Sequence, residues 1–221
     1  EALNFPWTIL AEKPISLNLE EVHEIEKKRM TLKRKLFVAM NRRQYGSTVA
    51  ACELLENDQN TRVVEIHDQE NIQAALASGS PKEVVSNWMV ANSIHLVDYF
   101  SVFCRGKLNE LRLIEKLNTK TPFLSMASLN FDSGDVGFYT AFWNAPGPWS
   151  VKITTQEQLL EMRPLEGLEQ QIFPKKFKNR ISLPKVDKEY KPGIYRQAEQ
   201  LVAATKSQHH SLPSLLDYLE T

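Results

Sequence analysis

The sequence predicts an α+β fold that is mostly helical, with one buried central helix at about residues 81–104 and a small antiparallel β-meander at about residues 122–153. Two observations lead to this prediction. The segment from Val84 to Cys104 is apolar around most of its circumference, and a helix of that kind lies inside a core. The chain also has only 8 glycines in 221 residues, which favours helices over a β fold with many tight turns.

Segment 18–41 has the pattern of an amphipathic helix. Asn18 is a suitable N-cap and Glu21 follows three residues later, as in a capping box. Apolar residues recur at spacings of three and four, and the acidic residues precede the basic ones, the order that a helix dipole favours. Beyond it we expect a helix at about 47–55, a short strand at 61–66 and a brief helix at 68–77.

The central helix begins at Ser80-Pro81, because serine suits the N-cap and proline the first helical position. It ends before Gly106. Leucines and an isoleucine at spacings of three and four then predict a further amphipathic helix over 108–117.

The meander is predicted from two apolar runs, 123–131 and 136–143, that flank Asp132-Ser133-Gly134-Asp135. Such a glycine-containing turn between strands is typical of a β-hairpin. A third strand at 149–153, a short helix after it, a long surface loop at 174–192 and a helix at 194–206 complete the pattern. The predicted division is an extended N-terminal arm (1–17), a single globular domain (18–208) and a short amphipathic tail (209–221).

The composition of the chain narrows the possible classes of protein. Lys+Arg and Asp+Glu both total 27, which argues against a protein whose whole surface binds nucleic acid or anionic membranes. No apolar run is long enough to span a membrane. Cys52 and Cys104 lie in apolar helical contexts, which indicates small buried residues in a reducing compartment, so we expect a cytoplasmic protein. A start at Glu1 without a leader pattern indicates a trimmed chain rather than a secretory precursor.

A basic cluster offers one functional hypothesis, nucleic-acid binding. If the helix reaches residue 41, its positions seven apart stack on one face, where they would neutralise phosphates. The alternative is an ordinary solvated face. The residues of this hypothesis are Lys27, Lys28, Arg34, Lys35 and Arg42.

His95 and Asp98 offer a second hypothesis, an enzyme of the hydrolase type. With Asn92 and Tyr99 they share one side of the central helix, and a histidine beside a carboxylate is a candidate general base or metal-ligand pair. No spacing supplies a nucleophile or a third ligand, so a hydrogen-bonded buried histidine is the alternative. The sequence contains no P-loop, G-x-G-x-x-G, G-x-S-x-G, H-E-x-x-H or C-x-x-C motif, and we predict no catalytic residue, cofactor or metal.

The favoured hypothesis is a non-catalytic interaction subunit or adaptor of a larger assembly rather than an enzyme. A strand with bulky aromatic residues on both faces needs a second cover besides one layer of helices, and such surfaces bind partners. The leucines of the tail form an apolar edge on a short helix. The predicted partner-binding residues, which would contact another protein or a multiprotein complex, are Tyr139, Trp143, Trp149, Leu212, Leu215, Leu216 and Leu219.

Overall fold

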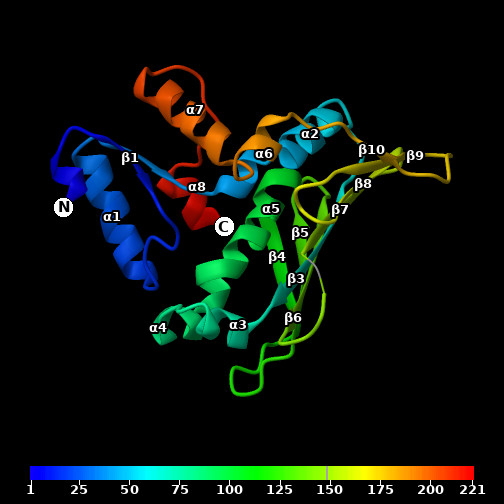
Figure 1. Ribbon diagram of the computed structural model, residues 1–221, viewed down its shortest axis with the longest axis horizontal. Helices are drawn as coiled ribbons and strands as arrows, with labels where there is room; N and C mark the ends of the chain where they lie inside the picture. Colours follow the sequence, from blue (N-terminus) through cyan, green and yellow to red (C-terminus); the bar gives the residue numbers. More distant parts are fainter. Residues whose placement is uncertain (148) are drawn as a thin grey trace. The chain divides into compact units, whose positions relative to one another are not determined.

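The computed structural model describes residues 1–147 and 149–221. Within these residues, backbone contacts divide the chain into two compact units (Figure 1). Unit 1 contains Glu1–Tyr45 and Val186–Thr221, and unit 2 contains Gly46–Lys185. Unit 1 therefore joins the two ends of the sequence, whereas unit 2 is one continuous segment. Of the Pro-Gly-Pro sequence after the hairpin, Pro148 lies outside the described residues.

The predicted fold class is wrong. Among the described residues, unit 2 is built on an eight-stranded mixed sheet rather than a small meander. The strand order is β10-β9-β8-β7-β3-β6-β5-β4 (Figure 1). Neighbouring strands are antiparallel except β3 and β6, which run parallel. The strands are β3 (Val63–Glu70), β4 (Leu108–Glu115), β5 (Leu124–Phe131), β6 (Val136–Trp143), β7 (Ser150–Thr154), β8 (Gln158–Met162), β9 (Glu169–Ile172) and β10 (Asn179–Arg180).

Side chains on the central strands alternate between a helix-covered face and an outer face, as the period of two requires. On β6, Tyr139 is 4% exposed and Phe138 is 42% exposed. Gly137 faces the helices, because a Cβ at this position would lie 2.6 Å from the ring of Phe100. The parallel register then assigns β3 to the same face, with these pairs: Val64 with Gly137, Ile66 with Tyr139, Asp68 with Ala141 and Glu70 with Trp143.

Two predicted helices are strands. The segment from Leu108 is β4, paired with β5, and its register shifts between Leu108 and Glu110 and again between Leu113 and Glu115. Such irregularities break the period of two, so the apolar spacing imitates a helix. The helix expected after residue 153 is instead part of the β7–β8 hairpin. By contrast, the β5–β6 hairpin and a strand near residues 61–66 are confirmed.

The predicted central helix is divided. The helices of unit 2 are α2 (Gly46–Leu55), α3 (Ile72–Ala77), α4 (Lys82–Ser86) and α5 (Ile94–Phe103), with a π turn at Met89–Ser93 directly before α5. The break after α4 occurs at Asn87, whose side chain donates to the backbone oxygen of Glu83. Side-chain bonds of this kind compete with helical ones. Burial is concentrated in α5, which packs on β3 (Figure 1).

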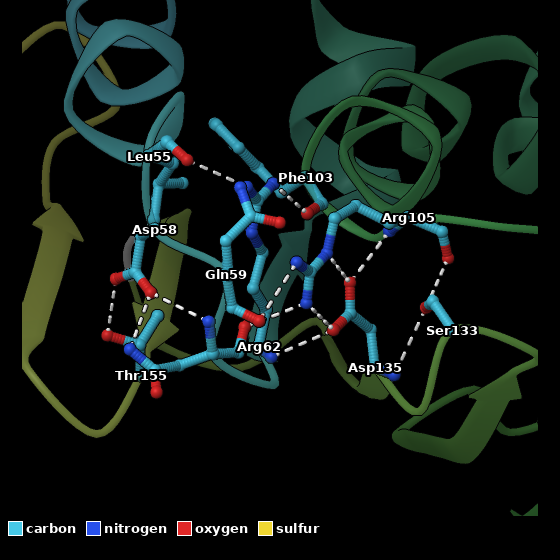
Figure 2. Close-up of polar contacts among 10 residues, drawn as sticks. Leu55, Asp58, Gln59, Arg62, Phe103, Arg105, Ser133, Asp135 and Thr155 are labelled. Atoms are coloured by element: carbon cyan, nitrogen blue, oxygen red, sulfur yellow. Dashed lines mark hydrogen bonds and ion pairs between the residues drawn. The ribbon is translucent and has the colours of Figure 1, made fainter.

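A buried ion pair ties the hairpin turn to this layer of helices. Asp135 is 0% exposed and accepts from the guanidinium of Arg105 at 2.8 Å and from the backbone N–H of Arg62 at 2.9 Å (Figure 2). Arg62 in turn donates to the backbone oxygens of Leu55 and Phe103, the last residues of α2 and α5. Burial alone would raise the pKa of Asp135, but these hydrogen bonds hold it below its usual value.

Unit 1, whose residues are all described, contains a two-stranded parallel sheet in which Thr8 pairs with Lys35. Helix α1 connects the two strands, and α8 packs on α1 and β2. Its elements are η1 (Ala2–Asn4), β1 (Thr8–Ala11), α1 (Leu19–Thr31), β2 (Lys35–Val38), η2 (Asn41–Gln44), α6 (Val186–Glu189), α7 (Ile194–Thr205) and α8 (Leu215–Glu220).

Helix α1 is shorter than predicted. Asn18 caps it, its Oδ1 accepting from the N–H of Glu20 at 2.8 Å, but the helix ends at Thr31. Lys33 follows with φ of 52°, a left-handed conformation that stops a helix. The next residues turn into β2, so the basic stripe that the nucleic-acid hypothesis required does not form on one helix.

Across the described residues, we find no helix with both the length and the apolar character needed to cross a membrane. The cytoplasmic location stays a prediction.

Candidate functional site

The most unusual chemical feature of unit 2 is a pair of acids in its interior. Asp68 and Glu70 occupy alternate positions at the end of β3, on the helix-covered face, and are 1% and 2% exposed. Buried carboxyl groups are costly unless they are hydrogen-bonded or protonated. The hydrogen-bond partners of these two acids therefore define the candidate site.

Glu70 accepts hydrogen bonds from one helical segment. Asn92 Nδ2 lies 2.9 Å from its Oε1 and 3.1 Å from its Oε2. Ser93 Oγ lies 3.3 Å from Oε1, and Trp88 Nε1 donates to Oε2. All three donors come from the π turn or the residue that precedes it.

Asp68 is held by a tyrosine of the neighbouring strand. The hydroxyl of Tyr139 on β6 donates to Asp68 Oδ2 at 2.7 Å. Asp68 Oδ1 is also buried, and among the described residues no amide, hydroxyl or ring N–H donates to it. A carboxyl proton on Glu70 fills this role, because a protonated acid is a donor as well as an acceptor.

The electrostatics agree with a protonated Glu70. Burial raises the pKa of Glu70 to about 8, and the charge of Asp68 and a hydrogen bond with Asp68 act in the same direction. The bonds from Trp88 and Asn92 oppose the rise. Burial and the nearby Asp68 also hold the pKa of Tyr139 well above its usual value. At neutral pH, Glu70 therefore keeps its proton and Tyr139 is a donor to Asp68.

His95 and Asp98 lie immediately after the π turn, in the first turns of α5, and are 7% and 3% exposed. Their spacing of three places them on one side of the helix. An imidazole exchanges protons near neutral pH, and a carboxylate on the same side stabilises its charged form. Their chemical types and their shared side of the helix make these two residues candidates for proton transfer.

Sequence reasoning identified His95 and Asp98 but missed Asp68, Glu70 and Trp88. A signal was present in β3, where acids occupy the positions that continue the buried apolar alternation of Val64 and Ile66. This pattern indicates buried acids only if the strand is known to be central in the sheet, which the pairing of β3 with β6 and β7 establishes.

The aromatic residues predicted to bind a partner lie in different surroundings. Tyr139 and Trp143 are buried on the helix-covered face, and Trp149 is half-buried, its Nε1 donating to the backbone oxygen of Gln69 at 2.8 Å. The outer face of β6 carries Phe138 instead.

In the tail, Leu212 and Leu215 are buried in unit 1, Leu219 is half-buried and Leu216 is 54% exposed. Leu215 belongs to α8, whose Ser214–Asp217 capping box fixes its start. The partner-binding role of these residues stays a prediction.

The basic residues of the nucleic-acid hypothesis lie on different elements of unit 1. Lys27 and Lys28 are exposed on α1. Arg34 Nε donates to the backbone oxygen of Leu3 at 3.1 Å, and Lys35 Nζ lies 2.8 Å from that of Ala204.

Arg42, the last residue of that set, is buried in η2. In the part of the chain that the structure describes, no group of three or more His, Cys, Asp or Glu residues is placed to hold a metal ion.

Comparisons identify the class of fold. No family model and no curated protein matches the chain. Solved structures do match, among them UDP-N-acetylglucosamine 3-dehydrogenase from Acidithiobacillus ferrooxidans, with a TM-score of 0.73 and 13% identity over 96% of this chain and 65% of that one. The aldose-aldose oxidoreductase from Caulobacter crescentus has a TM-score of 0.79 and 14% identity over 99% and 68% of the two chains. An NAD binding oxidoreductase from Klebsiella pneumoniae has a TM-score of 0.71 and 13% identity over 96% and 67%.

The chain therefore shares its fold with these solved structures, and it spans about 65% of the length of the first structure named. This finding corrects the functional predictions. The solved structures that share this fold are dehydrogenases and oxidoreductases, which contradicts the prediction of a non-catalytic adaptor or complex subunit and the expectation that the protein is not an enzyme.

The segment between β1 and α1 does not suit the pyrophosphate of a dinucleotide such as NAD. Unit 1 has a β–α–β arrangement, but a pyrophosphate requires a glycine-rich turn before the helix. Residues 12–18, between β1 and α1, contain no glycine. The first turn of α1 carries Glu20 and Glu21, whose charges repel phosphate at a helix N-terminus.

Proposed function

We propose that this chain acts in an oxidoreductase on a hydroxyl group of a polyhydroxylated, sugar-type substrate, and that it supplies the acid–base group of the reaction. The observation that carries the proposal is the likeness of nearly the whole chain to dehydrogenases and oxidoreductases, with TM-scores of 0.73 and 0.79. The buried pair of His95 and Asp98 adds a chemical group suited to that class.

The substrate class rests on the neighbours. One acts on a nucleotide sugar and another on aldoses by their names, so both substrates present several hydroxyl groups on a ring or chain. Recognition of such groups requires polar side chains that exchange donor and acceptor roles. Asn92 and His95, with the acids behind them, give unit 2 that character.

Oxidation of a hydroxyl group to a carbonyl removes a proton from oxygen and a hydride from carbon. The proposal assigns the proton to the imidazole of His95, with Asp98 stabilising the resulting positive charge. The hydride would pass to a nicotinamide dinucleotide, the group in the name of one neighbour. Because the segment before α1 does not suit its pyrophosphate, the proposal assigns only the proton transfer to this chain.

Ligand binding followed by saturation-transfer NMR tests the proposal directly. We expect the purified chain to bind an aldohexose and UDP-N-acetylglucosamine, with an affinity that depends on pH near neutrality, and not to bind cyclohexanol. In His95→Gln the pH dependence should disappear and the affinity should fall about tenfold, as expected for loss of one strong hydrogen bond.

His67→Gln is the matched control, because His67 is exposed on the same β3 strand and on the opposite face from Asp68. It should behave as the unmodified chain. Absence of binding to both sugars, or equal behaviour of His95→Gln and His67→Gln, would overturn the proposal.

A further inference from the structure

The π turn at Met89–Ser93 is the feature that sets the direction of His95. A π turn contains one more residue than a turn of α-helix, so the residues after it are rotated about the helix axis relative to those before it. His95 is the second residue of α5, directly beyond this turn. The orientation of its imidazole in unit 2 therefore depends on whether the extra residue is kept.

Glu70 is placed to keep it. Its carboxyl oxygens accept from the side chains of Trp88, directly before the turn, and of Asn92 and Ser93 at the end of the turn. In a π turn, the residues four and five positions after a given residue both lie next to it on the helix surface. Asn92 and Ser93 are four and five positions after Trp88, so the three side chains lie on one side of the helix. If the segment returned to regular α-helix, Ser93 would rotate away from the Trp88 side of the helix.

We propose that Glu70 is a positioning residue for His95, which it serves by fixing the π turn in front of the histidine. The inference rests on the proposed function for the meaning of His95, but the coupling between Glu70 and His95 is a property of unit 2 alone. This role explains why an acid occupies a buried position of the strand. An apolar residue in its place would leave the N–H of Trp88 and the amide of Asn92 without their acceptor.

The coupling has a pH dependence with a definite sign. Among the described residues, the titratable groups that interact with Glu70 are Asp68 on its own strand and Tyr139 on β6, which bonds Asp68. Below a pH of about 8 the proton on Glu70 bonds Asp68, and above it two buried negative charges must coexist. Ionised Glu70 binds its three donors more tightly but is repelled by Asp68. The geometry of the π turn, and with it the surroundings of His95, should therefore change as Glu70 titrates.

Titration of the ring nitrogens of His95 by NMR, without any ligand, tests this inference. In the unmodified chain we expect the His95 signals to show, besides the titration of the ring itself, a second transition near the pKa of Glu70. Glu70→Gln retains a donor toward Asp68 but cannot ionise, so the second transition should be absent.

Two further variants should move that transition in opposite directions. Trp88→Phe removes a bond that lowers the pKa of Glu70, and the transition should move to higher pH. Asp68→Asn removes the charge that raises this pKa, and the transition should move to lower pH. Each shift should be about 0.5–1 pH unit or more, the size that one hydrogen bond or one close charge produces.

Glu65→Gln is the control, because Glu65 lies on the outer face of β3, where it pairs with Lys152 at 2.8 Å. It should leave the His95 titration unchanged. A second transition that persists in Glu70→Gln, or that moves equally in all the variants, would overturn the inference. If Glu70→Gln does not fold, the opposite shifts of Trp88→Phe and Asp68→Asn decide the question. Because no sugar is used, a failure of ligand binding would refute the proposed function and leave this result standing.

Discussion

Replacement of Glu70 by glutamine should change how the stability of the protein depends on pH. The ordinary pKa of this carboxyl is 4.5, and in the folded protein burial and Asp68 raise it to about 8. Between these values the folded chain holds one proton that the unfolded chain has released. The free energy of unfolding therefore falls as pH rises, by about 1.4 kcal/mol per unit.

Over the whole window the loss amounts to about 4–5 kcal/mol, complete once the pH passes the pKa of the folded state. Glutamine has no charge to bury, so the variant should lack this slope. The free energies of unfolding of the two proteins should differ least near pH 5. Between pH 5 and about pH 8, the free energy of unfolding of the variant should rise relative to that of the unmodified chain. Asp58 and Asp135 have lowered pKa values, so their contributions lie at more acidic pH and cancel in the comparison.

Urea unfolding followed by tryptophan fluorescence at several pH values measures this difference. Glu65→Gln serves as the control, because the side chain of Glu65 is 35% exposed and its pair with Lys152 lies at the surface. Its stability should follow that of the unmodified chain at each pH. Parallel profiles for Glu70→Gln and the unmodified chain would refute the reasoning, since they would mean that Glu70 is ionised in both states.

Other positions give independent predictions. Asp135→Asn should cost about 1–3 kcal/mol in urea unfolding, because a buried amide cannot accept all the hydrogen bonds that the carboxylate receives from Arg105 and from the backbone N–H of Arg62; a loss under about 0.5 kcal/mol would contradict this. Gly137→Ala should cost about 1–3 kcal/mol, since its Cβ would lie 2.6 Å from the ring of Phe100, and Phe100→Leu should recover part of the loss in a double-mutant cycle. Iodoacetamide with mass spectrometry should label exposed Cys52 and spare Cys104, whose pKa burial raises to about 12; equal labelling of both would show that α5 opens.

The sequence predicted local features well where they depend on neighbouring residues. The β5–β6 hairpin follows from a glycine-containing turn between two apolar runs, and the cap of α1 follows from Asn18. Both are decided within a few residues, so one sequence contains the information.

It failed where pairing between distant segments decides the structure. β4 was predicted as a helix because its leucines match that spacing, and pairing with β5 makes it a strand. Propensity is a weak guide when a partner strand supplies the hydrogen bonds. The early end of α1 at Thr31 has no glycine or proline to mark it, since Lys33 itself takes the left-handed conformation.

For the site, the sequence offered His95 and Asp98 as one alternative, from their spacing on one helix, and predicted no catalytic residue. It did not identify Glu70, because an acid on a strand reads as a surface residue until its strand is known to be central. The class of enzyme was out of reach as well, since none of the short motifs that name a chemistry occurs in the chain. Comparison in three dimensions showed which solved structures share the fold, and the proposed function starts from that likeness.

The parallel pairing of β3 with β6 also determines when the acidic strand takes its place during synthesis. β3 lies between β6 and β7 in the sheet, and both of those strands follow it far along the sequence. While the chain emerges from the ribosome, Val63–Glu70 has no neighbour until β6 is complete at Trp143, and it has both only when the segment through Thr154 is available. Long-range pairings of this kind close late and slow folding. The strand that holds the π turn is thus among the last to be enclosed, and the candidate site is assembled only after most of unit 2 has been made.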